Sequence, residues 1–172
     1  LVSGDWVKPN LYKELRMRST HCRFIALGGA TEASIWSNMF EVTEVDPSWD
    51  AVPYGKALSN QEFRIVENGV DVPLGKRGEL WIGGDGLAKG YVSMPEQTAV
   101  SFVTKNGRRW YRTGDYGYLK PDGNIIFCGR KDSQVKLNGF RIELGEIDGK
   151  IRDLKDVSNS ITILTGSGNS QY

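Results

Sequence analysis

The chain has 172 residues, a net charge of +1 and 25% charged residues, which is typical of a soluble globular protein of one or two small domains. The balanced charge argues against a nucleic-acid surface, and no apolar run is long enough for a membrane span, so we expect a cytoplasmic protein. Two cysteines and one histidine are too few for a disulfide framework or a metal cluster.

The first 50 residues mix helical and strand signals. A helical piece near 11–18 precedes an apolar strand at 23–27, which runs into the glycine pair Gly28 and Gly29. Such alternation suits the edge of an α/β layer. His21 lies just before the strand, where a surface position is a better interpretation than a catalytic dyad.

The next region, 51–131, has a pattern that is nearly all β. Its expected strands are separated by turn signals, including Asn68-Gly69, and lie at 62–67, 70–74 and 78–83. One helix interrupts them, with Ser93 and Glu96 as a capping box and Pro95 in the first turn.

A Pro-Asp-Gly turn at Pro121 joins two segments with strand-like alternation. A two-residue type I′ loop at this turn places Asp115 directly opposite Arg130. In that register Leu119 lies on the face of the hairpin away from Ile125. The charged pair is either a rim ion pair that closes the sheet or part of a ligand site, and a longer loop would shift the register.

Past Gly129 the composition becomes charged and helical, and a second apolar strand is expected at 157–166. Two glycine-rich segments could approach a ligand. In ALGGATEASIW a strand leads into a tight turn followed by Thr31 and Glu32, whose carboxylate could hold a magnesium ion between phosphates. A plain turn with a helix cap is the simpler alternative. In 83–91, four glycines indicate mainly turn and bulge chemistry.

Four segments in this order, GGATE, GELWIGGDGLAKGY, YRTGD and GRKDSQVKLNGFRIELGEID, closely resemble successive core motifs of the adenylation domains of nonribosomal peptide synthetases. These domains belong to the adenylate-forming superfamily, with acyl-CoA ligases and luciferases. The resemblance covers almost the whole chain. It implies an α/β and β-rich fold, with the edge of an α/β layer at 1–50, a distorted β-barrel at 51–131 and the start of a small, truncated α+β C-terminal subdomain at 132–172.

The resemblance also implies a reaction in two halves. An amino-acid carboxylate attacks the α-phosphate of ATP, with Mg²⁺ as cofactor, to give an acyl-adenylate and pyrophosphate. A carrier thiol then takes the acyl group. The implied partners are the amino acid, a peptidyl carrier domain with its phosphopantetheine arm and the remainder of the synthetase, with no nucleic acid and no membrane.

By the same resemblance, six residues contact the nucleotide or its metal: Gly28 and Gly29 along adenine, Thr31 at the α-phosphate, Glu32 at magnesium, Asp115 at the ribose hydroxyls and Arg130 at the ribose and phosphates. The threonine, the glutamate and the arginine are thus the expected catalytic residues. Asp132 falls at the hinge of the small subdomain, and Lys136 and Gly139 lie in the loop that would face the carrier.

The resemblance places an amino-acid pocket around the GGATE motif and the strand before it, lined by Leu1, Ser3, Leu27, Ile35 and Trp36. A small apolar pocket with one hydroxyl suits a short polarisable side chain. It is similar to the pocket of cysteine-activating domains in thiazoline-forming synthetases. The alternative is that Ile35 and Trp36 are core residues of the following strand.

The sequence departs from the family pattern at Gly28, where the usual residue is a tyrosine that stacks on adenine. How the base is held is therefore open. The phosphate loop and the late catalytic lysine of the family are expected outside this chain, so we expect the chain alone to be inactive. The alternative functions are an acyl-CoA or aryl-acid ligase and a noncatalytic barrel module.

Overall fold

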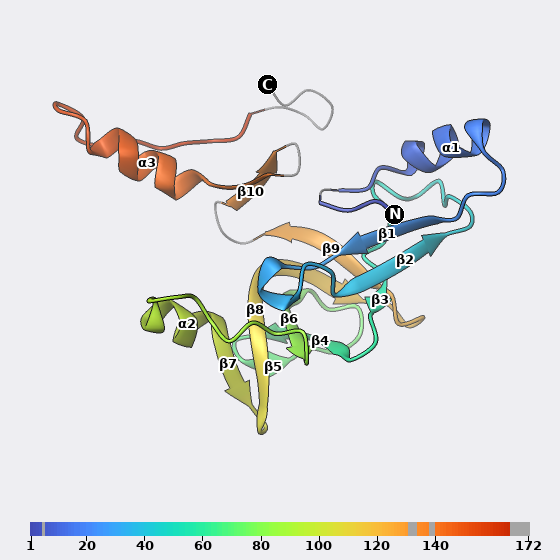
Figure 1. Cartoon of the computed structure of the whole chain (residues 1–172), viewed down its shortest axis with the longest axis horizontal. Coiled ribbons are helices and arrows are strands. Elements are labelled where there is room, and N and C mark those ends of the chain that lie inside the picture. Colours follow the sequence, from blue (N-terminus) through green and yellow to red (C-terminus); the bar gives the residue numbers. More distant parts are fainter. Residues whose placement is uncertain (5, 131–133, 138–139, 166–172) are drawn as a thin grey trace. The chain divides into compact units, whose positions relative to one another are not determined.

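The computed structural model describes the residues 1–4, 6–130, 134–137 and 140–165 (Figure 1). The chain divides into two compact units, Leu1–Gly129 and Arg130–Tyr172. The three-part division expected from the sequence, with boundaries after residues 50 and 131, stays a prediction. Among the helices in the described ranges, none is long and apolar enough to cross a membrane.

The first unit begins with a small antiparallel sheet whose strands, in spatial order, are β1 (Phe24–Gly28), β2 (Asn38–Val42) and β3 (Lys56–Ala57). Helix α1 (Pro9–Arg18) starts with a proline at its first positions, where the missing N–H costs nothing. It packs Tyr12 against Phe24 and Val42, so the apolar face of the strand pair is buried. A helix packed on a sheet agrees with the mixed α/β character expected from the sequence.

A curled antiparallel sheet forms the rest of the first unit, in a half-barrel. Its strands run in the order β5-β4-β6-β8-β7, with β9 also on β8, and are β4 (Gln61–Glu67), β5 (Val70–Asp71), β6 (Gly78–Gly84), β7 (Phe102–Lys105), β8 (Arg108–Leu119) and β9 (Ile125–Arg130). Successive side chains bury on opposite faces, since Leu80 joins one apolar cluster and Trp81 the other. Strand β5 ends before Pro73, which has no N–H for a sheet and starts a turn instead.

Helix α2 (Pro95–Ser101) has its proline in the first turn, as expected, but the predicted capping box is wrong. Met94 is the N-cap residue and makes no side-chain cap hydrogen bond, while Ser93 adopts a φ of +58°. Thr98 ties the helix to the preceding loop instead, because its hydroxyl accepts the Tyr91 N–H at 2.9 Å and donates to the Met94 carbonyl at 2.8 Å.

The hairpin of β8 and β9 has a three-residue loop, not the predicted two-residue type I′ loop. The Lys120 N–H donates to the Asn124 carbonyl at 2.8 Å, and the Gly123 N–H donates to the Lys120 carbonyl at 2.9 Å. Gly123 has a φ of +81° and Asp122 has no positive φ, which is the pattern of a type I turn followed by a left-handed glycine. The Asn124 N–H further donates to Asp122 Oδ1 at 2.9 Å.

The longer loop shifts the register by one residue. Leu119 now packs in the same cluster as Ile125 and Phe127, so the predicted assignment of faces is wrong. If the strands are regular, pairing Lys120 with Asn124 brings Gly129 opposite Asp115. The two-residue loop from which Asp115 was predicted to face Arg130 is therefore not the loop that forms.

The second unit contains the antiparallel pair β10 (Gln134–Leu137) and β11 (Phe140–Glu143), followed by helix α3 (Leu144–Arg152). The strand predicted at 157–166 is wrong for the described residues 157–165, which have no strand structure. Their polar side chains bond to the helix instead: Ser160 Oγ donates to the Asp148 carbonyl at 2.8 Å, and Thr162 Oγ1 lies 2.6 Å from Asp148 Oδ1.

Candidate functional site

The candidate site starts where β1 ends and the chain reverses direction. Gly29 has a φ of +146°, and a Cβ added there would lie 2.6 Å from the Ile35 carbonyl oxygen and 2.6 Å from the Ser37 nitrogen. Only glycine allows this close approach. The Ser37 N–H donates to the Gly28 carbonyl at 2.7 Å, and the Ile35 N–H donates to the Ala30 carbonyl at 3.0 Å. The turn is thus closed by main-chain hydrogen bonds.

Inside this turn, residues Thr31–Ala33 form one turn of 3-10 helix, η1. Thr31 is exposed, whereas Glu32 is buried with 7% of its surface accessible. The N-cap residue Ala30 makes no side-chain cap hydrogen bond. Two adjacent residues of the motif thus differ in their access to solvent.

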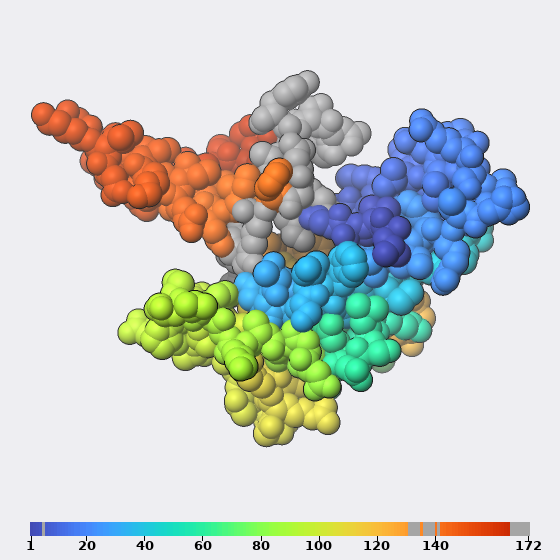
Figure 2. Space-filling view, in the orientation of Figure 1, coloured from blue at the N-terminus to red at the C-terminus, as the bar shows by residue number. Residues whose placement is uncertain are grey.

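The second glycine-rich segment packs against the first. The Ala88 N–H donates to the Glu32 carbonyl at 2.8 Å, and the Ser34 hydroxyl donates to the Gly86 carbonyl at 2.8 Å. The Tyr91 hydroxyl donates to Glu32 Oε1 at 2.7 Å. Figure 2 shows the blue turn beside the yellow-green loop. Segments almost sixty residues apart in the chain thus build one surface around a buried carboxylate.

Two phenols, Tyr91 and Tyr111, lie close to this carboxylate. Tyr111 is 2% exposed, and its burial, followed by the charge of Glu32, raises the pKa of its hydroxyl. Burial and the hydrogen bond to Glu32 likewise raise the pKa of Tyr91. Both phenols therefore keep their protons at neutral pH and act as donors.

Thr31 and Glu32 supply oxygen donors of the kind that magnesium prefers. Among the residues that the structure describes, no group of three histidine, cysteine or acidic side chains could hold a metal by itself. Magnesium commonly uses one or two carboxylates and completes its coordination with waters and substrate phosphates. The residues present therefore fit a magnesium ion brought in with a nucleotide.

Asp115 lies on β8 and is buried, with 8% of its surface exposed. Its N–H donates to Thr113 Oγ1 at 2.9 Å, and the threonine hydroxyl donates to the Leu80 carbonyl at 2.7 Å. The register between β6 and β8 shifts between Glu79 and Trp81, next to this bond, as at a β-bulge that redirects a side chain. Arg130 ends β9, is half-buried and begins the second unit.

The residues predicted to line an amino-acid pocket lie around β1 and the turn that follows it, and the pocket itself stays a prediction. Residues 1–3 run beside β1, since the Leu27 N–H donates to the Val2 carbonyl at 2.8 Å. The indole N–H of Trp36 donates to Ser3 Oγ at 3.2 Å. Leu1 and Ile35 are 77% and 65% exposed. Ile35 and Trp36 lie before β2 and are exposed, so the alternative that they are core residues of that strand is wrong.

Gly28 has a neighbour that the sequence did not indicate. A Cβ added to Gly28 would lie 2.3 Å from Cε2 of Tyr54, so the tyrosine ring fills the space where a side chain at position 28 would begin. The ring also stacks on Phe127, with centroids 5.7 Å apart and planes inclined by 29°. A larger residue at position 28 requires this ring to move.

A family model described as AMP-binding enzyme matches residues 1–92, which is more than half of the chain. The chain belongs to this family of AMP-binding enzymes. Pyochelin synthetase PchE of Pseudomonas aeruginosa is 48% identical over 170 residues, which cover 98% of this chain and 12% of that protein. Phenyloxazoline synthase MbtB of Mycobacterium sp. is 44% identical over 172 residues, which cover 99% of this chain and 15% of that protein.

The fold comparison agrees with this assignment. The crystal structure of the Vibrio cholerae adenylation domain AlmE in complex with glycyl-adenosine-5'-phosphate matches with a TM-score of 0.85 and 30% identity, over 99% of this chain and 33% of that chain. The chain is thus a segment of an adenylate-forming ligase domain of the nonribosomal peptide synthetase type.

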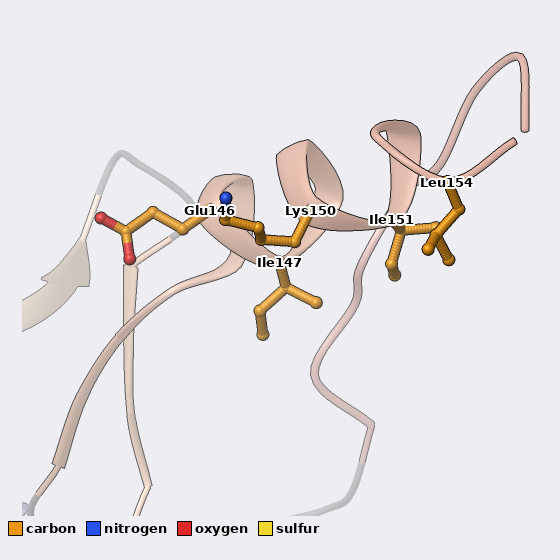
Figure 3. Close-up of a pocket in the computed structure, with 5 residues that line it drawn as sticks. All are labelled: Glu146, Ile147, Lys150, Ile151 and Leu154. Carbon is orange, nitrogen blue, oxygen red and sulfur yellow. The ribbon is translucent and has the colours of Figure 1, made fainter.

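Three other predicted positions of the adenylation domain lie in the second unit. Asp132 and Gly139 fall outside the described residues, and Lys136 belongs to β10. The second unit also has a groove along α3, lined by Glu146, Ile147, Lys150, Ile151 and Leu154 (Figure 3). Among the predicted site residues that the structure describes, none lines this groove.

Sequence reasoning missed Tyr54, Tyr91 and Tyr111 as neighbours of the predicted site residues Gly28 and Glu32. Tyr91 ends the glycine-rich GGDGLAKGY segment, so an aromatic residue at the end of a ligand-side loop was an available signal. Tyr54 and Tyr111 lie in ordinary strand-like patterns. Only their contacts with Gly28 and Glu32 distinguish them.

Proposed function

We propose that the chain is part of an adenylation domain that activates an amino acid, with cysteine as the substrate, in nonribosomal peptide synthesis. ATP and Mg²⁺ are its cofactors, and the product is an aminoacyl-AMP that passes to a carrier thiol. The observation that carries this proposal is the closed turn at Gly29, which holds exposed Thr31 beside buried Glu32. In such a domain the half-barrel would be part of a distorted β-barrel, and the second unit would be the start of a small C-terminal subdomain.

The chemistry needs positioning and charge neutralisation more than a protein nucleophile. The substrate carboxylate attacks the α-phosphorus of ATP, and pyrophosphate leaves. Thr31 would contact the α-phosphate and Glu32 would hold magnesium, which neutralises phosphate charge when bound. The buried carboxylate of Asp115 has two acceptor oxygens for the ribose cis-diol, and Arg130 would bind the ribose and phosphates.

Cysteine is proposed from the residues around the turn. Leu1, Leu27 and Ile35 supply apolar surface, while Ser3 and Trp36 add one hydrogen-bonded polar edge. A small site of this kind suits a short polarisable thiol. The hydrogen bond between the indole and the serine hydroxyl supports one site built from residues that are distant in sequence.

The proposed partners follow from the same family. A peptidyl carrier domain would present its phosphopantetheine arm to the loop with Lys136 and Gly139, after rotation of the small subdomain about Asp132. The remainder of the synthetase would complete the catalytic machinery. Cytoplasmic location and the lack of nucleic-acid and membrane partners stay predictions.

The test is amino-acid-dependent exchange of pyrophosphate into ATP by the full-length parent protein, across a panel that includes cysteine, serine and aryl acids. Strong exchange with cysteine, lost in Asp115→Ala and kept in Asp122→Ala, is the expected result. Asp122 is a matched control because it is an exposed aspartate in the hairpin loop. Exchange with an aryl acid would favour the ligase alternative, and no exchange with any acid would favour a noncatalytic module.

A further inference from the structure

Glu32 carries a charge that the fold has to stabilise. Among the described residues, the buried acidic side chains are Glu32 and Asp115. A buried carboxylate is costly unless hydrogen-bond donors replace water. The Tyr91 hydroxyl is such a donor, 2.7 Å from Glu32 Oε1. A hydrogen bond to a charged acceptor at this distance is stronger than a neutral one and fixes the direction of the acceptor.

Tyr91 is itself held from two sides. Its N–H donates to Thr98 Oγ1 at 2.9 Å, which ties its backbone to helix α2. Its ring meets Phe102 edge to face, with centroids 5.8 Å apart and planes at 65°. The phenol therefore has little freedom to follow a moving carboxylate, and its hydrogen bond restrains Glu32 Oε1.

The loop before Tyr91 is anchored in the same way. The Arg109 guanidinium donates to the Ala88 carbonyl at 2.6 Å and to the Lys89 carbonyl at 2.7 Å. The Ala88 N–H in turn donates to the Glu32 main chain. Backbone and side chain of Glu32 are thus both held by the loop that ends at Tyr91.

We propose that Tyr91 is a positioning residue, whose hydroxyl fixes the Glu32 carboxylate in the orientation that receives the magnesium ion of the bound nucleotide. This inference rests on the proposed role of Glu32. A carboxylate with one oxygen tied presents its plane in a fixed direction, which reduces the rotational freedom lost when a metal binds. Outer partners of this kind commonly account for a factor of about 10–100 in metal affinity.

The experiment uses the full-length parent and the variants Tyr91→Phe, Glu32→Gln and the double variant, with Tyr118→Phe as the matched control. The control variant also removes one phenol hydroxyl from the half-barrel. Tyr118 lies on β8, seven residues after Tyr111. Mn²⁺ binding in the presence of ATP is measured by electron paramagnetic resonance, and the Mg²⁺ dependence of pyrophosphate exchange is measured beside it. Thermal unfolding checks that each variant is folded.

Tyr91→Phe is expected to weaken Mn²⁺ binding about tenfold and to raise the half-saturating Mg²⁺ concentration by a similar factor, with less than a twofold change in Tyr118→Phe. In the Glu32→Gln background the same change should have less than a twofold effect, because coupled residues are not additive. Equal Mn²⁺ binding in Tyr91→Phe and Tyr118→Phe, or an undiminished effect without Glu32, would overturn the inference. Failure of the proposed function would give a different result: the wild-type parent would show no amino-acid-dependent exchange of pyrophosphate but would still bind Mn²⁺ with ATP.

Discussion

Replacement of Gly29 by alanine should break the turn that carries Thr31 and Glu32. The φ of Gly29 is +146°, a conformation that L side chains rarely adopt. The new Cβ would lie 2.6 Å from the Ile35 carbonyl oxygen and equally close to the Ser37 nitrogen. Both are backbone atoms, and the Ser37 N–H is the donor of one hydrogen bond that closes the turn, so no side-chain rotation can relieve the overlap.

The magnitude follows from two costs. A non-glycine residue in a sparsely populated backbone conformation costs about 1–3 kcal/mol. Forcing an extra carbon into a packed site costs about 1–3 kcal/mol more. We therefore expect Gly29→Ala to lower the free energy of unfolding by about 2–6 kcal/mol, which is a large share of the stability of a typical domain.

Gly75→Ala is the matched control. Gly75 also has a positive φ, +77°, but a Cβ there would meet nothing within 4 Å, so only the backbone cost applies. Urea unfolding of the chain, followed by the fluorescence of buried Trp81 and Trp110, measures both variants. The expected difference between them is about 1–3 kcal/mol. Equal losses in the two variants would refute the argument that close backbone approach selects glycine at position 29.

Two further predictions concern the other glycine and the hairpin loop. Gly28→Tyr should lower the thermal unfolding temperature because Tyr54 fills the space, and Gly28→Tyr with Tyr54→Ala should recover most of the loss; an unchanged single variant would contradict this. The backbone hydrogen bond from Asn124 lowers the pKa of Asp122. Because the pKa is lower in the folded state, ionised Asp122 stabilises the fold above the unfolded pKa of about 3.9. This stabilisation is lost as the pH falls through the folded pKa. Asp122→Ala and wild type should therefore converge in unfolding free energy as pH is lowered from 7 to 3, and a constant gap in urea titrations would contradict this.

Local sequence determined most elements of the half-barrel. The Asn68-Gly69 turn appears as expected, with φ values of +51° and +78°, because both residues tolerate the left-handed region. Pro95 opens helix α2 because a proline at this position loses no hydrogen bond. The motif around Gly29 was also recognisable in sequence, since a strand that leads into two glycines has few structural alternatives.

Where two local solutions were nearly equal, tertiary packing decided. The Pro-Asp-Gly turn is compatible with a two-residue or a three-residue loop, and only the longer loop puts Leu119 beside Ile125 in the apolar cluster. The predicted capping box at Ser93 does not form, and the hydrogen bonds of Thr98 join helix α2 to the preceding loop instead.

The sequence by itself determined the motifs, several strands of the half-barrel and the residues proposed to meet the nucleotide. Only the tertiary structure showed that Glu32 is buried against Tyr91 and Tyr111, and that Tyr54 fills the space beside Gly28. The physical reason is distance along the chain. Backbone preferences act over a few neighbouring residues, whereas the bond between Tyr91 and Glu32 joins residues 59 positions apart and exists only once the sheet has brought them together.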